Sequence, residues 1–350
     1  MKATDDRAEA GAEPGAVTIA YIAESAGVSI PTVSKVLNRR GGVSDQTRAR
    51  VEELISLHGY RKPVGNRSNV VELVFRELDS LWAVEVIRGV ERAARKHRAV
   101  VMVSEVRGDG PPGRSIEETA GRRPNCVLAV NRLSPEEREQ LTAAGVPFVI
   151  IDPLDDLPDE VPFVGSTGFR GGQAAMRHLL DLGHRRIAMI SGTGQPVIVP
   201  RQSGFLAALA QDGLTHDPEL LAGSPFTREG GRAAALELLA LPERPTAFVT
   251  VSDPQALGVY QAAGELGLSV PRDLSVVGFD DLPIASWAEP PLTTVHQPLN
   301  EMAAAATELA LALGRREEVQ QGGTEIATTL TVRGSTARPK RCRSGPPSQT

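Results

Sequence analysis

A lysine and two small hydroxyl side chains lie close together in the segment 29–38, which reads SIPTVSKVLN. The hydroxyls of Thr32 and Ser34 can bond phosphate oxygens, and the ammonium group of Lys35 can reach a phosphate or a base edge. At about 100° per residue, Lys35 points away from the apolar face of a helix built from this segment. The pattern favours contact with a nucleic acid, although a helix that only completes a small protein core remains an alternative.

Other candidate chemistry in the chain is weak. The stretch SGTGQP at 191–196 has two glycines after an apolar run, but it lacks the third glycine and the acidic residue of a dinucleotide site. Asp280 and Asp281 could bind a metal, yet no third ligand stands near them in the sequence. The two cysteines, Cys126 and Cys342, are far apart, so a disulfide framework is not expected. We expect no enzyme activity, no cofactor and no metal.

Three short helices must position the segment 29–38. Apolar residues at i, i+3, i+4 and i+7 predict a first helix, with Thr18 as its N-cap and Gly27 in the tight turn that follows. Ser29 and Ser44 can cap a second and a third helix. A glycine turn before the second of three helices is typical of a helix-turn-helix, whose second helix fits the DNA major groove. The predicted core positions are Ile19, Ile22, Ala23, Ala26, Val33, Val36, Leu37, Val51, Leu54, Ile55 and His58.

The charge of the chain is unevenly distributed. The net formal charge of −5 over 350 residues by itself argues against a polyanion partner. Between Val17 and Pro63, however, seven Lys and Arg stand against four Asp and Glu, and the stretch 335–350 carries four positive charges. A basic head on an acidic body fits a polyanion partner at one end only. Because the first sixteen residues are polar and no run of about eighteen apolar residues occurs, we expect a cytoplasmic protein without a membrane partner.

From Val70 onward, short apolar runs alternate with longer segments of helical period. Apolar strands that alternate with helices are typical of parallel sheets covered on both faces, so the fold class is α/β. The units are too many for one compact sheet, and we therefore expect two similar lobes. The clearest apolar runs are VVELVF (70–75), CVLAV (126–130), PFVII (147–151), RIAMI (186–190), TAFVTV (246–251) and LSVVGF (274–279).

The segment VTIAYIAESAGVSIPTVSKVLN, at 17–38, resembles the head of the lactose-repressor (LacI/GalR-type) family. The match continues through Val43, Ser44 and the Gly59–Tyr60 pair in one register. The resemblance implies that the base-reading positions fall on Ile30, Pro31 and Lys35. Together with the hydroxyl chemistry it gives these candidate DNA-binding residues: Thr18, Ser29, Ile30, Pro31, Thr32, Ser34, Lys35 and Asn38.

The body is also similar to this family, in GHRRIAMISG (183–192), VSDPQALGVY (251–260) and PPLTTVHQPL (290–299). The resemblance implies a periplasmic-binding-protein-like body of two Rossmann-like lobes that close on a ligand. The expected organisation is a disordered tail at 1–16, a three-helix helix-turn-helix domain at 17–62, a shortened linker at 63–69, an effector-binding domain at 70–334 and a disordered basic tail at 335–350. Lobe one is expected at about 70–163 and 296–322, and lobe two at about 165–293 and 324–334.

The same resemblance places the candidate effector-binding residues at the carboxyl ends of strands, where ligands of such sheets bind. Carboxylates there can accept hydrogen bonds from sugar hydroxyls, an aromatic ring can stack on a sugar, and an arginine can clamp a polar group. The alternative for Asp280 is a turn cap, and the alternative for Trp82 is an ordinary buried aromatic. The apolar Val199 stands where sugar-binding relatives carry a further arginine. The candidates are Trp82, Asp152, Arg201, Phe226, Ser252 and Asp280.

The linker departs from the family pattern. The family usually has a short helix after the tyrosine–proline segment that wedges a leucine into the DNA minor groove. In this chain PVGNRSN, at 63–69, leads directly into a predicted strand and holds no leucine. About six residues span only roughly 20 Å when extended. We therefore predict a weaker DNA kink.

These observations predict a transcriptional regulator, a repressor, that binds a near-palindromic double-stranded DNA operator as a homodimer and responds to a sugar-like small molecule. A solute-binding protein of sugar uptake shares the body, but it has no use for the head and needs an export signal. A third possibility is a regulator whose body only dimerises.

Overall fold

The computed structural model describes residues 18–37, 41–58, 68–78, 80–106, 115–154, 156–193, 198–319 and 322–340. The chain divides into two compact units, Met1–Arg67 and Ser68–Thr350, here called the head and the body. The predicted tail at 1–16 and linker positions 63–67 lie outside the described residues. Among the residues described, no helix is both long and apolar enough to cross a bilayer.

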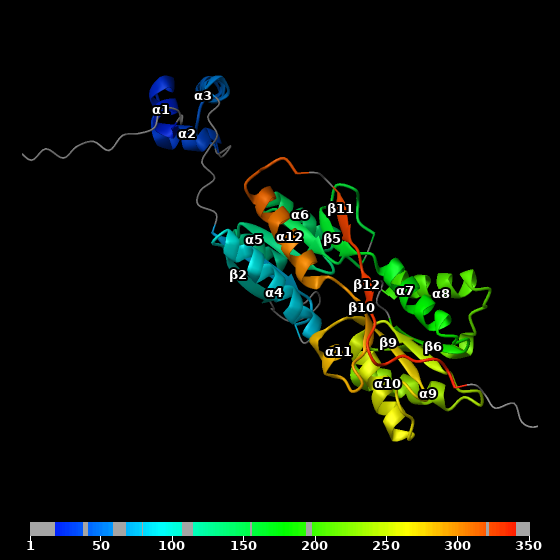
Figure 1. The fold of residues 1–350 in the computed structure, drawn as a ribbon. Helices are drawn as coiled ribbons and strands as arrows, with labels where there is room; N and C mark the ends of the chain where they lie inside the picture. The colour runs from blue at the N-terminus through cyan, green and yellow to red at the C-terminus, as the bar shows by residue number, and fades with distance from the viewer. Residues whose placement is uncertain are drawn as a thin grey trace, which may run out of the picture. The chain divides into compact units, whose positions relative to one another are not determined.

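The head is the predicted bundle of three short helices (Figure 1). They are α1 (Ile19–Ala26), α2 (Ile30–Leu37) and α3 (Asp45–Leu57). The Thr18 hydroxyl caps α1 by accepting a hydrogen bond from the backbone N–H of Tyr21, and Gly27 ends the helix with φ +68°. Apolar side chains of all three helices form the core, namely Ile22, Ala23, Ala26, Val33, Val36 and Val51.

The first lobe of the body is built on a sheet of six parallel strands in the order β11-β5-β4-β3-β1-β2. The strands are β1 (Val70–Phe75), β2 (Val100–Glu105), β3 (Cys126–Val130), β4 (Phe148–Ile151), β5 (Phe163–Ser166) and β11 (Gly323–Ile326). Alternate strand residues face opposite sides, so the sheet forms one core with α4 (Leu81–Lys96) and α12 (Leu299–Gly314), and another with α5 (Ile116–Arg122) and α6 (Pro135–Ala143).

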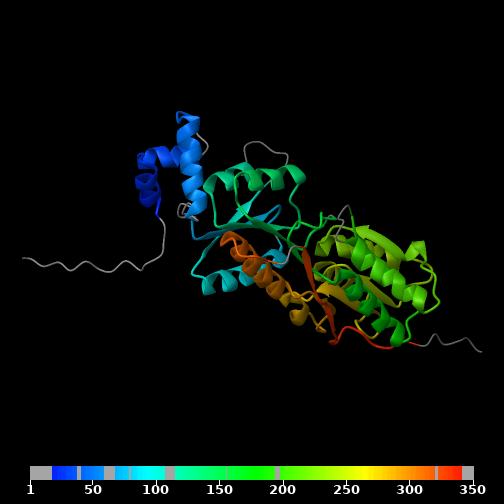
Figure 2. The same cartoon turned by 90° about the horizontal axis from the view of Figure 1, so that it is seen from above.

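The second lobe repeats this design, and each sheet lies between two layers of helices (Figure 2). Its sheet has the order β12-β10-β9-β8-β6-β7, in which only β12 is antiparallel to its neighbour. The strands are β6 (Ile187–Gly192), β7 (Leu221–Ser224), β8 (Ala247–Thr250), β9 (Ser275–Asp280), β10 (Thr293–His296) and β12 (Thr329–Thr331). The helices are α7 (Gly168–Asp181), α8 (Ile198–Gln211), α9 (Arg228–Leu239), α10 (Asp253–Glu265) and α11 (Pro283–Trp287), with a 3₁₀ turn η1 at Pro218–Leu220.

The chain passes between the lobes after β5, after β10 and after β11. The lobe boundaries therefore differ in detail from the prediction. Residues 324–326 belong to lobe one, because β11 pairs in parallel with β5, whereas the sequence prediction placed them in lobe two. Likewise β10 belongs wholly to lobe two, since it pairs with β9.

The stretch 335–340, predicted as part of a disordered tail, is packed against lobe two. The buried Ser335 hydroxyl donates to the carbonyl of Val276 at 2.6 Å and accepts the N–H of Thr293 at 2.7 Å. Lys340 forms an ion pair with Asp273. These bonds hold a polar segment in place without an apolar stripe, so the prediction was wrong for 335–340; residues 341–350 lie outside the described part.

Candidate functional site

The helix α2 presents the outward face that the sequence predicts. Val33 and Val36 are buried in the head core, while Pro31 and Lys35 are exposed and Ile30 is 47% exposed. This face is therefore available for a partner.

The hydroxyl residues of the head serve first as helix caps. The Ser29 hydroxyl lies 2.9 Å from that of Thr32 and accepts the Thr32 backbone N–H at 3.4 Å. Thr18 caps α1, and Ser34 is half-buried. Asn38 lies outside the described residues. The DNA contacts of these side chains stay predictions.

In the body, Arg201 of α8 lies at the centre of the predicted effector site. It is 5% exposed, its Nη1 donates to the carbonyl of Val251 at 2.6 Å, and the same atom lies 3.1 Å from Oδ1 of Asp280. The guanidinium carbon sits 4.0 Å from the ring centroid of Phe279, a cation–π contact that supports a buried charge. The arginine is thus held rigidly at the end of β9.

Gln297, which follows β10 at a crossing between the lobes, is the residue that sequence reasoning missed. Its amide nitrogen donates to Oδ2 of Asp152 at 2.9 Å and to the Ser166 hydroxyl at 3.1 Å, both in lobe one. Its amide oxygen accepts from Nη2 of Arg201, in lobe two, at 3.0 Å. The signal was present in the family-like stretch PPLTTVHQPL, but nothing in a glutamine's chemistry singles it out.

Arg201 stands between two buried carboxylates, one from each lobe: it pairs directly with Asp280 and is linked to Asp152 through Gln297. Burial raises the pKa of Asp280 to about 7, and it also raises the pKa of Asp152, although Arg201 acts in the opposite direction on both. Asp280 has φ +108° and Asp152 has φ +50°, a region that non-glycine residues rarely adopt. Strained backbone and perturbed acids together are typical of a ligand site.

The remaining predicted effector residues differ in whether they contact this cluster. The indole N–H of Trp82 donates to the Gln297 amide oxygen at 3.3 Å. The Ser252 hydroxyl caps α10 and donates to the side chain of Gln255 at 3.2 Å, so it is engaged within its own lobe. Phe226 packs against the apolar core of lobe two. The structure therefore brings together Trp82, Asp152, Arg201 and Asp280, whereas the contacts of Ser252 and Phe226 described here are made within lobe two.

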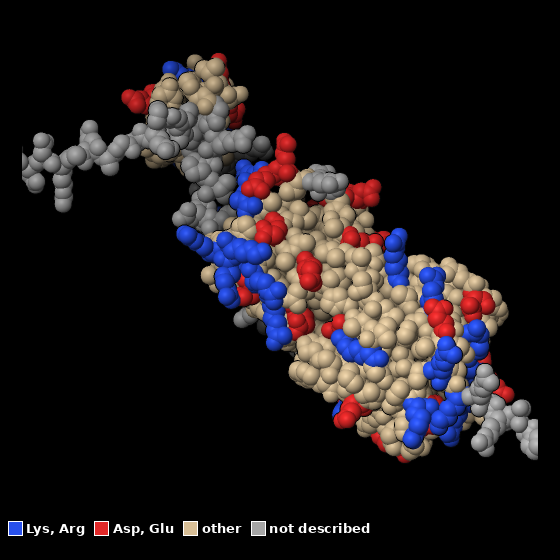
Figure 3. Space-filling model, in the orientation of Figure 1, with Lys and Arg blue, Asp and Glu red and all other residues tan. Residues whose placement is uncertain are grey.

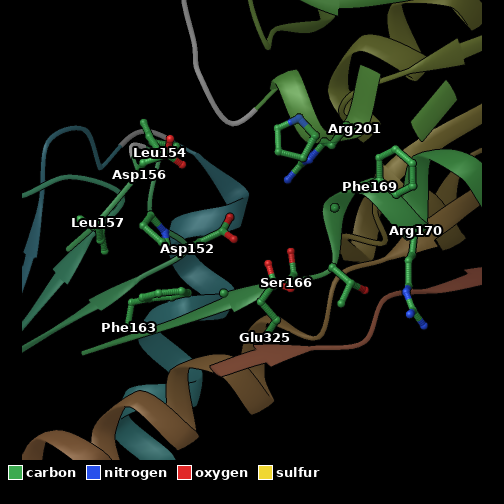
Figure 4. Close-up of a pocket in the computed structure, with 15 residues that line it drawn as sticks. Asp152, Leu154, Asp156, Leu157, Phe163, Ser166, Phe169, Arg170, Arg201 and Glu325 are labelled. Carbon is green, nitrogen blue, oxygen red and sulfur yellow. The ribbon is translucent and has the colours of Figure 1, made fainter. Parts of the chain in front are cut away.

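A cavity of about 630 Å³ opens beside the cluster (Figure 4). Asp152 and Arg201 line it from opposite lobes, and the α7 residue Phe169 lies on the same side as Arg201, across from Asp152. Asp280 and Gln297 line a second cavity of about 300 Å³. The polar cluster thus separates two hollows, and Trp82, Phe226 and Ser252 line neither of them.

Cations gather on the exposed side of α4, as Figure 3 shows in blue. Arg88 and Arg95 on this helix are paired with Glu85 and Glu91, so part of the charge is offset locally. Such exposed pairs contribute little to stability. Within the described ranges, no group of three or more His, Cys, Asp or Glu side chains could hold a metal ion.

Residues 18–62 match the family described as "Bacterial regulatory proteins, lacI family", and residues 176–336 match "Periplasmic binding protein-like domain". The "HTH-type transcriptional regulator MalR" of Streptomyces coelicolor is 35% identical over 91% of this chain and 96% of its own length. The "HTH-type transcriptional repressor CytR" of Escherichia coli is 31% identical over 92% and 96%.

Solved structures agree. The "transcriptional regulator CelR-cellobiose complex" has a TM-score of 0.69 at 31% identity and covers 91% of this chain and 99% of its own. The lac repressor dimer bound to operator and an anti-inducer has a TM-score of 0.67 at 26% identity, with 92% and 99% covered. Since the similarity spans both head and body, this chain belongs to the lacI family of bacterial regulatory proteins.

Proposed function

We propose that this protein is a sequence-specific DNA-binding transcriptional regulator that acts as a repressor. The single observation that carries the proposal is the exposed outward face of α2, with Ile30, Pro31 and Lys35 free of the head core. A homodimer would place two such helices in successive major grooves, because two-fold symmetry in the protein requires two-fold symmetry in the operator. Acting on bacterial DNA, it works in the cytoplasm.

The body senses a small molecule bound between its lobes. Asp152, Arg201 and Asp280 present two acceptors and one donor group at the lobe junction, which suits the hydroxyls of a sugar. Relatives described with bound cellobiose and ribose support this class of effector. Effector binding changes lobe closure and thereby the dimer surfaces that hold the heads in register.

A solute-binding protein of sugar uptake is the alternative for the body alone. The head argues against it, and the relatives that match along the whole chain are regulators, not transport proteins. No catalytic step is proposed, since the polar groups of the cleft are arranged to hold a ligand and to join the lobes.

Genome-wide footprinting of the full chain, followed by binding to the recovered sites, tests the DNA-binding role. Lys35→Ala should weaken operator binding by about 1–3 kcal/mol if Lys35 reads a base. Lys96→Ala, which removes an exposed lysine from α4 of the body, serves as the matched control and should leave affinity unchanged. Equal affinity of wild type and Lys35→Ala for every site would refute the assignment of Lys35.

The linker prediction can be tested with the same sites. Without the wedging leucine, the operator should be bent less sharply than by a family member that inserts one. Circular-permutation gel shifts measure the bend, and a sharp kink at the operator centre would contradict the prediction.

A further inference from the structure

The 630 Å³ cavity continues well beyond the polar cluster that would hold one sugar ring. At its inner end lie Asp152, Ser166 and Arg201, and from there it extends over the loop after β4 and the first turn of α7. Since one water occupies about 30 Å³ in the liquid, the space corresponds to about twenty water-sized groups. A single hexose ring leaves much of this space unfilled.

Apolar side chains from both lobes wall the outer part of the cavity. Lobe one contributes Leu154, Leu157 and Phe163, and lobe two contributes Phe169 and Pro200. The Phe163 ring lies over the backbone of Gly323, where an added Cβ would meet two ring carbons at 1.9 Å. The Phe163 ring can therefore take this position only because the neighbouring strand β11 carries a glycine, without a side chain, at position 323.

Phe169 is the most informative of these residues. It is 43% exposed on the first turn of α7, and it lies across the cavity from Asp152 (Figure 4). An exposed aromatic ring beside carboxylates and hydroxyls suits a ligand with an apolar face and a polar edge. At the outer rim of the cavity, polar side chains are available to bond the polar edge of such a ligand: Asp156, Thr167 and Glu325.

We propose that the effector is an oligosaccharide of at least two rings, an inference that rests on the proposed function. One ring binds Asp152, Ser166 and Arg201, and the next lies with its apolar face against Phe169, opposite the wall formed by Phe163. Hydroxyls along the ring edges bond the rim. The outer aromatic residues thus set the preference for length, while the inner cluster binds the first ring.

Calorimetry with the full chain tests this, using a panel of free hexoses and pentoses, their two- and three-ring oligomers, and a nucleoside. The tightest oligomer should bind at least tenfold more strongly than its own single ring. Phe169→Ala should lower the affinity for that oligomer by about tenfold and leave the affinity for the single ring unchanged. Leu266→Ala is the matched control, because it removes an apolar side chain that is also 43% exposed but lies outside the cavity lining. It should leave the affinities for the oligomer and for the single ring unchanged.

The outcomes separate this inference from the proposed function. A single ring that binds as tightly as its oligomers, or a nucleoside that binds more tightly than any sugar, overturns the inference and leaves the regulator intact. If Phe169→Ala lowers the affinity for the single ring as much as the affinity for the two-ring oligomer, the inference is also overturned. Operator binding by the same preparation is measured in parallel. It tests the DNA-binding role independently of the result of the sugar titrations.

Discussion

Glu72 in lobe one and Asp280 in lobe two are both buried carboxylates, but the two acids have very different surroundings. In lobe one, Glu72 lies in the middle of β1 with no exposed surface and accepts hydrogen bonds from Ser104 at 2.9 Å, Thr119 at 3.0 Å and Arg122. In lobe two, Asp280 lies at the end of β9 with a left-handed backbone, and it pairs with Arg201, which Gln297 links to Asp152 of the other lobe.

The difference teaches that burial alone does not mark a functional acid. Glu72 is satisfied entirely by its own lobe, so its network holds one sheet to one helix. Asp280 pairs with Arg201 of its own lobe, but that arginine is linked through Gln297 to Asp152 of the other lobe, so the electrostatic surroundings of Asp280 change when the lobes move. A ligand can compete for the second arrangement but has no access to the first.

The largest effect should come from removing the shared cation. Arg201→Met leaves Asp152 and Asp280 buried without a counter-charge and should lower the free energy of unfolding by about 3–5 kcal/mol at pH 8. Urea unfolding measures it. Arg122→Met should cost less, because Arg122 is 34% exposed and its carboxylate partner keeps two hydroxyl donors. Equal losses in the two variants would break the comparison.

Exchanging each acid for its amide should separate stability from sensing. Glu72→Gln should cost about 1–3 kcal/mol of stability, because it unbalances a satisfied network, and it should leave effector affinity unchanged. Asp280→Asn removes a buried charge, so stability should hold or rise while affinity for the tightest-binding sugar falls more than tenfold. Calorimetry beside urea unfolding checks both, and a reversed pattern would contradict our interpretation.

The pH dependence of stability should reflect the cleft acids. The pKa of Asp280 is raised to about 7 in the folded chain, above its unfolded value near 4. The folded state therefore holds the proton more tightly, and stability falls as pH rises from about 4 to 7, by at most about 1.4 kcal/mol per unit for one group. The raised pKa values of Asp152 and of the buried Asp253 act in the same direction. In Asp280→Asn the free energy of unfolding should fall less steeply between pH 4 and 7. If the fall is as steep as in the wild type, groups other than Asp280 cause it.

The smallest effect concerns Ser252, whose hydroxyl caps α10. Ser252→Ala should cost about 1 kcal/mol of stability through the lost cap. Since that hydroxyl is engaged with Gln255, we expect effector affinity to stay the same. A clear loss of affinity would instead restore Ser252 to the ligand contacts predicted from the sequence.

Periodic features could be predicted from the sequence, and long-range polar contacts could not. The apolar spacing in the head gave its three helices, and the apolar runs gave the central strands, because burial imposes a period on these segments. Gln297 escaped notice because its partner Asp152 is 145 residues away. The edge strand β11 has the polar sequence GTEI, and Ser335 is ordered by one buried hydroxyl, so neither carries a hydrophobic pattern.

The three crossings between the lobes have a consequence for recombination. Neither lobe is a continuous stretch of chain, so no single crossover in a gene can exchange one lobe for another without splitting a sheet. The boundary at Arg67 and Ser68 is different, because one cut there separates the head from all of the body. New pairings of operator and effector can therefore arise by exchange at that junction, whereas a single crossover inside the body would join parts of two different sheets.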